Sequence, residues 1–163
     1  MEEWRPIPGF PGYSVSNLGN VRNDELGHAM GIMTNQFGLT HVGLTRNLIQ
    51  HRRAVGLLVA KAFLPPPPNA LFDTPIHLNG DRSDNRVENL LLRPRWFAVK
   101  YNKQFLEEPK GFRRPVVEKR TGEVFPTSWD AAIKYGLIDH EIMVATMNNT
   151  FVWPTYQTFR TVE

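Results

Sequence analysis

The spacing of apolar and polar positions changes along the chain and predicts different elements in successive segments. Up to about residue 48, short alternating runs such as Tyr13–Ser16 and Thr40–Leu44 stand among frequent Gly, Pro, Asn and Ser. Alternation interrupted by turn-forming residues predicts a small β-rich module. From His51 to Phe63 the apolar residues recur at helical spacing and Pro65 prevents continuation, so we predict a core-facing helix there.

The last third of the chain carries the signals of a hairpin followed by two short helices. Residues 116–125 hold Thr121-Gly122 at a hairpin-like position, and Pro126-Thr127-Ser128 follows as a helix start signal. We predict one helix over residues 129–135, stopped by Gly136, and a second over residues 139–147, a spacing typical of a helix-turn-helix. Together with the β-rich start, these elements predict a fold of the α+β class.

The composition narrows the classes of function without selecting one. The 163 residues are 41% hydrophobic, as in one soluble domain or a string of small modules. Cysteine is absent, which excludes disulfides and thiolate zinc sites and leaves nitrogen and oxygen ligands for any metal. The start lacks a signal-peptide pattern and no apolar run approaches the roughly 18 residues of a membrane helix, so we expect a cytoplasmic protein. A net charge of +3 and a pI near 9.4 permit binding to a polyanion.

The segment Ile76 to Leu90, IHLNGDRSDNRVENL, places a histidine and an asparagine twelve positions apart. Between His77 and Asn89 lie Asn79-Gly80-Asp81 and then Ser83-Asp84-Asn85, residues that form tight loops and not helices. A histidine ahead of such a loop can be held as a base. The sequence therefore offers His77 as a candidate catalytic residue.

This segment resembles the motif of HNH endonucleases. The matching residues are His77, Gly80 and Asn85-Arg86-Val87-Glu88-Asn89-Leu90, preceded by a helix with His51-Arg52 at its start and Ala62-Phe63-Leu64-Pro65 at its end. Residues 13–22, YSVSNLGNVR, resemble the nuclease-associated modular motif found ahead of HNH domains, and residues 121–138 are similar to the helix-turn-helix motif that ends phage-type homing endonucleases. The resemblance implies an N-terminal module at 1–48, a ββα-metal HNH domain at 49–106 and a C-terminal DNA-reading module at 112–163.

The resemblance also implies roles for single residues. His77 would be the general base at the end of a β-hairpin strand, and Asn89 would brace the loop by hydrogen bonds. One Mg²⁺ or Mn²⁺ ion would lie between the residue before His77 and a third motif residue on the following helix. The position before His77 is Ile76, which has no donor atom for a metal. Counting nine residues past Asn89 gives Ala98, whereas aligning the tryptophan of the family gives Asn102, which we prefer as the metal ligand.

Two functions remain open at this point. The first is a phage-borne HNH homing-type endonuclease that nicks or cuts double-stranded DNA. The second is a catalytically impaired descendant, acting as a DNA-binding regulator or as a structural component of a larger phage assembly. A protein partner at the C-terminal module is a separate possibility. We predict DNA contacts by cationic side chains around the loop and in the C-terminal module, which are Arg82, Arg86, Arg93, Arg95, Lys100, Lys103, Lys134 and His140.

Overall fold

The structure, a computed structural model, describes residues 1–163. The chain divides into two compact units, Met1–Arg95 and Trp96–Glu163, each with a hydrophobic cluster of its own. No helix is long and apolar enough to cross a membrane. The division into three modules at the residues given above stays a prediction.

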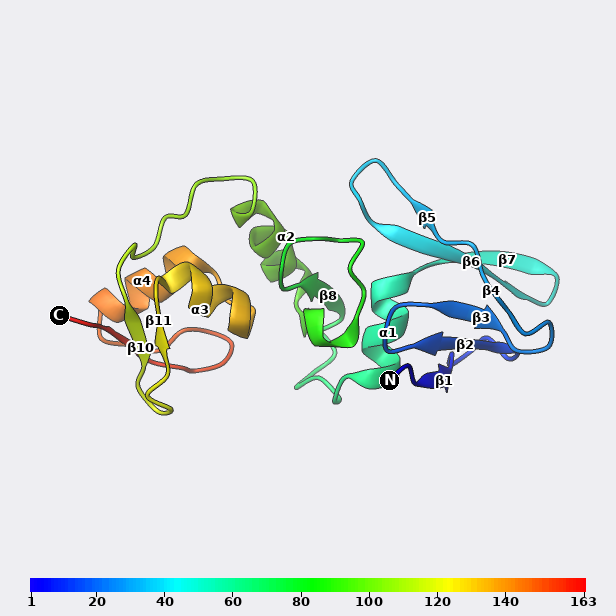
Figure 1. The fold of residues 1–163 in the computed structure, drawn as a ribbon, viewed down its shortest axis with the longest axis horizontal. Coiled ribbons are helices and arrows are strands. Elements are labelled where there is room, and N and C mark those ends of the chain that lie inside the picture. The colour runs from blue at the N-terminus through cyan, green and yellow to red at the C-terminus, as the bar shows by residue number, and fades with distance from the viewer. The chain divides into compact units, whose positions relative to one another are not determined.

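Two small antiparallel sheets make up most of the β structure of the first unit (Figure 1). One sheet has the strand order β1-β2-β3-β4, and the other has the order β5-β6-β7. The β content predicted for the start of the chain is therefore confirmed. The strands are β1 (Trp4–Pro6), β2 (Tyr13–Ser16), β3 (Val21–Asn23), β4 (His28–Ala29), β5 (Met33–Thr34), β6 (Thr40–Arg46) and β7 (Ile49–Ala54).

The helix that was expected to begin at His51 begins at Val55, so the prediction is wrong for residues 51–54. Helix α1 spans Val55–Phe63, and residues 51–54 belong to β7. Strands β6 and β7 are joined by a two-residue turn, Asn47-Leu48, with φ angles of 52° and 63°. Turns of this kind join the two strands of a hairpin, and the pairing of β7 with β6 extends from the turn as far as Ala54. Hydrogen bonding to β6 thus holds residues 51–54 extended, and the helix begins only where the pairing ends.

Helix α1 shares one core with the strands around it. Val15 of β2, Leu44 of β6 and Val59 of α1 are all fully buried in the same cluster. On another side α1 packs against the hairpin of β8 (Thr74–His77) and β9 (Leu90–Arg93), with Leu90 buried in the same cluster. The ββα order predicted for the central segment starts with this hairpin, which is therefore fixed to the N-terminal sheets by a common apolar core.

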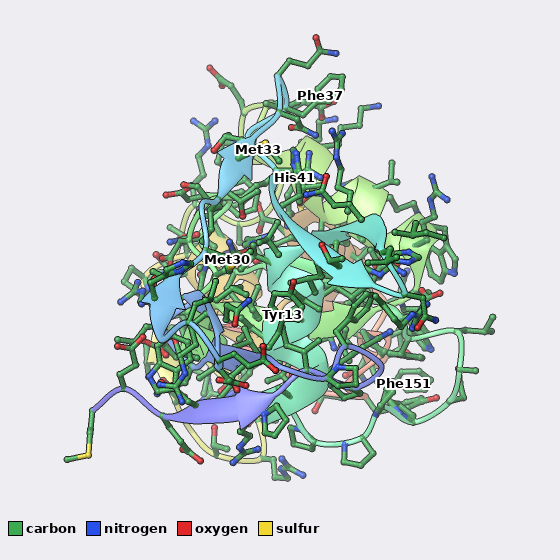
Figure 2. The ribbon with its side chains drawn as sticks, turned by 90° about the vertical axis from the view of Figure 1, so that its right-hand side faces the viewer. Tyr13, Met30, Met33, Phe37, His41 and Phe151 are labelled. Carbon is green, nitrogen blue, oxygen red and sulfur yellow. The ribbon has the colours of Figure 1, made fainter.

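The outer end of the β5–β6–β7 sheet carries apolar side chains that this core does not bury. Figure 2 shows Met33 and Phe37 there, and both are exposed. His41, the register partner of Met33 on β6, is buried.

The second unit combines three helices with one small sheet. The predicted hairpin is confirmed by β10 (Val116–Glu118) and β11 (Val124–Phe125), and β12 (Phe159–Thr161), which was not predicted, completes the order β11-β10-β12. The helices are α2 (Arg95–Gln104), α3 (Ser128–Tyr135) and α4 (Asp139–Met147). With α1, the chain has four helices and several small sheets, so the mixed α and β class predicted from the sequence is confirmed.

Local signals explain the first helix of the predicted helix-turn-helix, and core burial holds the second. Thr127 caps α3 in a capping box with Asp130, in which each side chain accepts a hydrogen bond from the other residue's backbone N–H. Gly136 ends α3 in the left-handed conformation, at φ 67° and ψ 47°. Leu137 and Ile142 then bury their side chains in the core of the unit. The predicted bounds of both helices agree with the structure to within one residue.

Candidate active site

The loop between β8 and β9 carries His77 and Asn89 at its two ends. Strands β8 and β9 pair antiparallel, and His77 is the register partner of Leu90. The backbone N–H of Gly80 donates to the carbonyl of His77 at 2.9 Å, and Gly80 has a φ of 78° that favours glycine. A single 3₁₀ turn, η1 (Val87–Asn89), leads from the loop into β9. His77 therefore lies at the point where a paired strand gives way to a tight turn.

Asn89 connects both halves of this loop through its side chain. Its Oδ1 accepts from the backbone N–H of Asn79 at 3.0 Å. Its Nδ2 donates to Oδ1 of Asn79 at 2.9 Å and to the backbone carbonyl of Asp84 at 2.8 Å. Asn89 is 6% exposed, so these bonds are shielded from solvent competition. These hydrogen bonds link the start and the middle of the loop to Asn89, as expected of a residue that braces the loop.

A second set of polar contacts orders the middle of the loop. Arg86 donates from Nε to Oδ1 of Asp84 and from Nη2 to Oδ2, both at 2.8 Å. Asn79 donates to Oδ2 of the same carboxylate at 2.9 Å. The hydrogen bonds from Arg86 lower the pKa of Asp84 to about 2. Asp84 is therefore a charged anchor of the loop, and its oxygens are engaged by neighbouring side chains.

His77 is buried and makes one side-chain hydrogen bond. Its side chain is 2% exposed, and Nε2 lies 2.8 Å from Oδ1 of Asn85. Asn85 in turn donates from Nδ2 to Oγ1 of Thr40 at 2.6 Å. Burial lowers the pKa of His77, and the hydrogen bond with Asn85 opposes this shift only in part. Burial therefore favours the neutral imidazole, in which one ring nitrogen carries a lone pair.

Asn85 is the member of this site that sequence reasoning did not single out. It is 5% exposed, although it stands in a run of turn-forming and charged residues that reads as solvent-facing. Its only sequence signal was its place in the family-like run from Asn85 to Leu90. Spacing from His77 does not reveal the contact, because the loop must first fold back on the strand.

The residues around His77 do not fit the divalent metal that the resemblance implies. No group of three His, Cys, Asp or Glu side chains in the chain is placed to hold a metal ion. Ile76, at the position where the family places a ligand, is fully buried and offers no donor atom. Asn102 is half-buried on α2 and belongs to the second unit.

The cationic residues predicted to contact DNA fall into both units. In the first unit, Arg82 is half-buried and Arg86 is paired with Asp84, whereas Arg93 is buried, which weighs against a phosphate contact. Arg95, the last residue of this unit, is exposed.

In the second unit the cations are exposed, and most have acidic partners. Lys100 lies 3.5 Å from Glu141 and over the ring of Trp96, and Lys103 lies 3.9 Å from Glu107. On the helices of the C-terminal module, the side chain of Lys134 is bound to Glu123, and His140 is exposed in the first turn of α4. Their roles in DNA binding stay predictions.

Comparison with known proteins gives three findings. The NUMOD4 motif matches residues 2–45. The chain is 33% identical over 106 residues to the uncharacterized HNH endonuclease L247 of Acanthamoeba polyphaga mimivirus, a match that covers 63% of this chain and 25% of that relative. The chain thus spans about a quarter of the length of the relative that it matches.

The third finding concerns the fold. A solved structure on DNA binding and cleavage by the HNH homing endonuclease I-HmuI matches with a TM-score of 0.55 and 21% identity, over 98% of both chains. The structure therefore defines a protein with the fold of an HNH homing endonuclease. The NUMOD4 motif and the mimivirus relative agree with this assignment, and the predicted resemblance to the HNH homing endonuclease family is confirmed.

Proposed function

We propose that this protein is a DNA endonuclease of the HNH type that hydrolyses phosphodiester bonds with His77 as the general base. The observation that carries the proposal is a buried histidine at the end of β8, ahead of a loop whose fold is fixed by Asn89 and Asp84. The fold match to I-HmuI and the identity to an HNH endonuclease support the same assignment.

The chemistry explains why a neutral histidine suits this position. Hydrolysis of a phosphodiester requires a water that loses a proton as it attacks in line with the leaving oxygen. An imidazole that burial keeps neutral at pH 7 has a lone pair available for that proton. The ordered loop keeps the imidazole of His77 in one orientation, and such positioning lowers the entropic part of the barrier to proton transfer.

Double-stranded DNA is the proposed substrate and partner. The net charge of +3 and exposed cationic side chains such as Arg95 and Lys100 allow phosphate contacts on the surface. The finer layout is part of the proposal, with an N-terminal module, a central ββα domain and a C-terminal reader that presents α4 to DNA. Dependence on Mg²⁺ or Mn²⁺ stays a prediction of the resemblance, and the assay below tests it separately.

The test is nicking of supercoiled plasmid by the purified chain at low salt, in parallel samples with Mg²⁺, with Mn²⁺ and with a chelator. We expect the wild type to nick DNA and His77→Ala to lose about 10²- to 10⁴-fold in rate, the usual contribution of a general base. His28→Ala is the matched control, because His28 is exposed on β4 and should not matter. A wild type that nicks under none of the conditions, or a His77→Ala that nicks at the wild-type rate, would refute the proposal.

A further inference from the structure

The hydrogen bond of His77 reaches into the N-terminal part of the chain. Oδ1 of Asn85 lies 2.8 Å from Nε2 of His77 on one side, Nδ2 donates to Thr40 on the other, and all three residues are buried. Thr40 is the first residue of β6 and lies inside the stretch that matches the NUMOD4 motif. The segment that resembles an accessory module therefore supplies an atom to the surroundings of the candidate base.

The amide of Asn85 decides which atom faces His77. An asparagine side chain has a donor nitrogen at one end and an acceptor oxygen at the other. In the structure Nδ2 donates to Oγ1 of Thr40 at 2.6 Å, and Oδ1 lies 2.8 Å from Nε2 of His77. An acceptor at that distance requires a hydrogen on Nε2. A neutral imidazole carries only one ring hydrogen, so its lone pair then lies on Nδ1.

The position of Asn85 is fixed by close packing as well as by hydrogen bonds. A Cβ added at Gly56 of α1 would lie 2.9 Å from Oδ1 of Asn85 and 3.3 Å from Nε2 of His77. A Cβ added at Gly19 would lie 3.0 Å from Cβ of Asn85. Backbone thus approaches Asn85 at two places where the chain has glycine, its amide oxygen at Gly56 and its Cβ at Gly19. Asn85 is held between Gly19 and Gly56, and its amide nitrogen contacts Thr40.

We propose that Thr40 and Asn85 are positioning residues that fix the tautomer of His77, with the hydrogen on Nε2 and the lone pair on Nδ1. The other tautomer would place the lone pair of Nε2 against Oδ1 in a buried site, where an unpaired acceptor is costly. The catalytic meaning of this arrangement rests on the proposed nuclease function: Nδ1 is the atom that takes the proton from water. The NUMOD4-matching segment then contributes to the chemistry of the site through Thr40.

The direct measurement is a long-range ¹H–¹⁵N correlation spectrum of the imidazoles in the full ¹⁵N-labelled chain, above the ordinary histidine pKa of about 6.5. The signals of His77 are assigned by their loss in His77→Gln. We expect Nε2–H in the wild type and in Thr40→Ser, which keeps the hydroxyl. Thr40→Val removes the hydroxyl, so the amide of Asn85 can turn over and the spectrum should show both tautomers. Nδ1–H in the wild type, or an unchanged tautomer in Thr40→Val, would overturn the proposal.

The nicking assay tests the catalytic part. We expect Thr40→Val to lose roughly tenfold or more in rate, within the contribution of a general base, while Thr40→Ser stays near the wild type. Equal rates in Thr40→Val and Thr40→Ser, with a changed tautomer, would overturn the catalytic role. Asn85→Ala removes the contact with His77 entirely. If Asn85→Ala does not fold, Thr40→Val still decides the question. A wild type that does not nick would refute the proposed function, while the spectrum would still decide the tautomer.

Discussion

Replacing Asn89 by alanine tests whether this side chain holds the β8–β9 loop together. Asn89→Ala removes three side-chain hydrogen bonds, two to Asn79 and one to the carbonyl of Asp84. The backbone bonds of residue 89 remain, since Leu78 donates to its carbonyl and its own N–H donates to Arg86. The perturbation is therefore confined to what the side chain contributes.

The expected cost follows from these three bonds. A typical hydrogen bond contributes about 0.5–1.5 kcal/mol net, so three of them amount to about 3 kcal/mol. Asn79 is exposed, so water can partly replace its lost partners. We therefore expect the free energy of unfolding to fall by about 2 kcal/mol relative to the wild type. With a urea dependence of about 1–3 kcal/mol per molar, the midpoint should fall by roughly 0.7–2 M.

Two measurements and one control decide the outcome. Urea unfolding gives the global loss, and hydrogen exchange of the Asn79 amide, which donates to Asn89, gives the local one. Asn69→Ala is the matched control, because Oδ1 of Asn69 accepts a single hydrogen bond from the N–H of Leu71 in an exposed turn. If both variants unfold at the same urea concentration and the Asn79 amide keeps its protection, Asn89 does not brace the loop.

Two further predictions concern stability in each unit. Gly111→Ala should destabilise the second unit by about 3 kcal/mol, because its Cβ would collide with Oδ1 of Asp139 and disturb the buried hydrogen bond that Ser128 donates to this atom. Gly31→Ala, whose Cβ meets nothing within 4 Å, is the control, and equal thermal unfolding of the two variants would contradict the reasoning. The hydrogen bonds from Arg86 lower the pKa of Asp84 from 3.8 to about 2, so the folded chain binds this proton more weakly than the unfolded chain, and the stabilisation is present above pH 3.8 and lost as the pH falls towards 2. Asp84→Asn should therefore melt below the wild type at about pH 5 and approach it near pH 2, and a constant difference would count against the argument.

Elements with complete local signals could be predicted from the sequence. Helix α3 has a capping box at Thr127 and a left-handed glycine at Gly136, and both signals act within a few residues. Strand β7 was missed because its hairpin turn, Asn47-Leu48, has leucine where such turns usually have glycine. Strand β12 was missed because its only partner, β10, precedes it by some forty residues. Pairing between distant segments leaves no local pattern.

The candidate site could likewise be predicted only in part from the sequence. His77 and the Asn89 position could be found from spacing, since the loop that joins them is local. The contact of His77 with Asn85 and Thr40 could not, because Thr40 lies 45 positions from Asn85 and is brought there by the packing of α1 between the sheets and the hairpin. What a buried polar side chain bonds to depends on tertiary packing, which the sequence pattern does not contain.

The shared core around α1 limits how this chain can be cut and recombined. Val42 and Leu44 lie inside the stretch that matches the NUMOD4 motif, yet they are buried in one cluster with Val59 of α1 and Leu90 of β9. A join at residue 45 would divide β6 and uncover that cluster. Protein engineers who exchange the N-terminal segment between relatives should therefore place the junction in the exposed proline run 65–68, after α1, and keep leucine at position 90, which packs in the same core from β9.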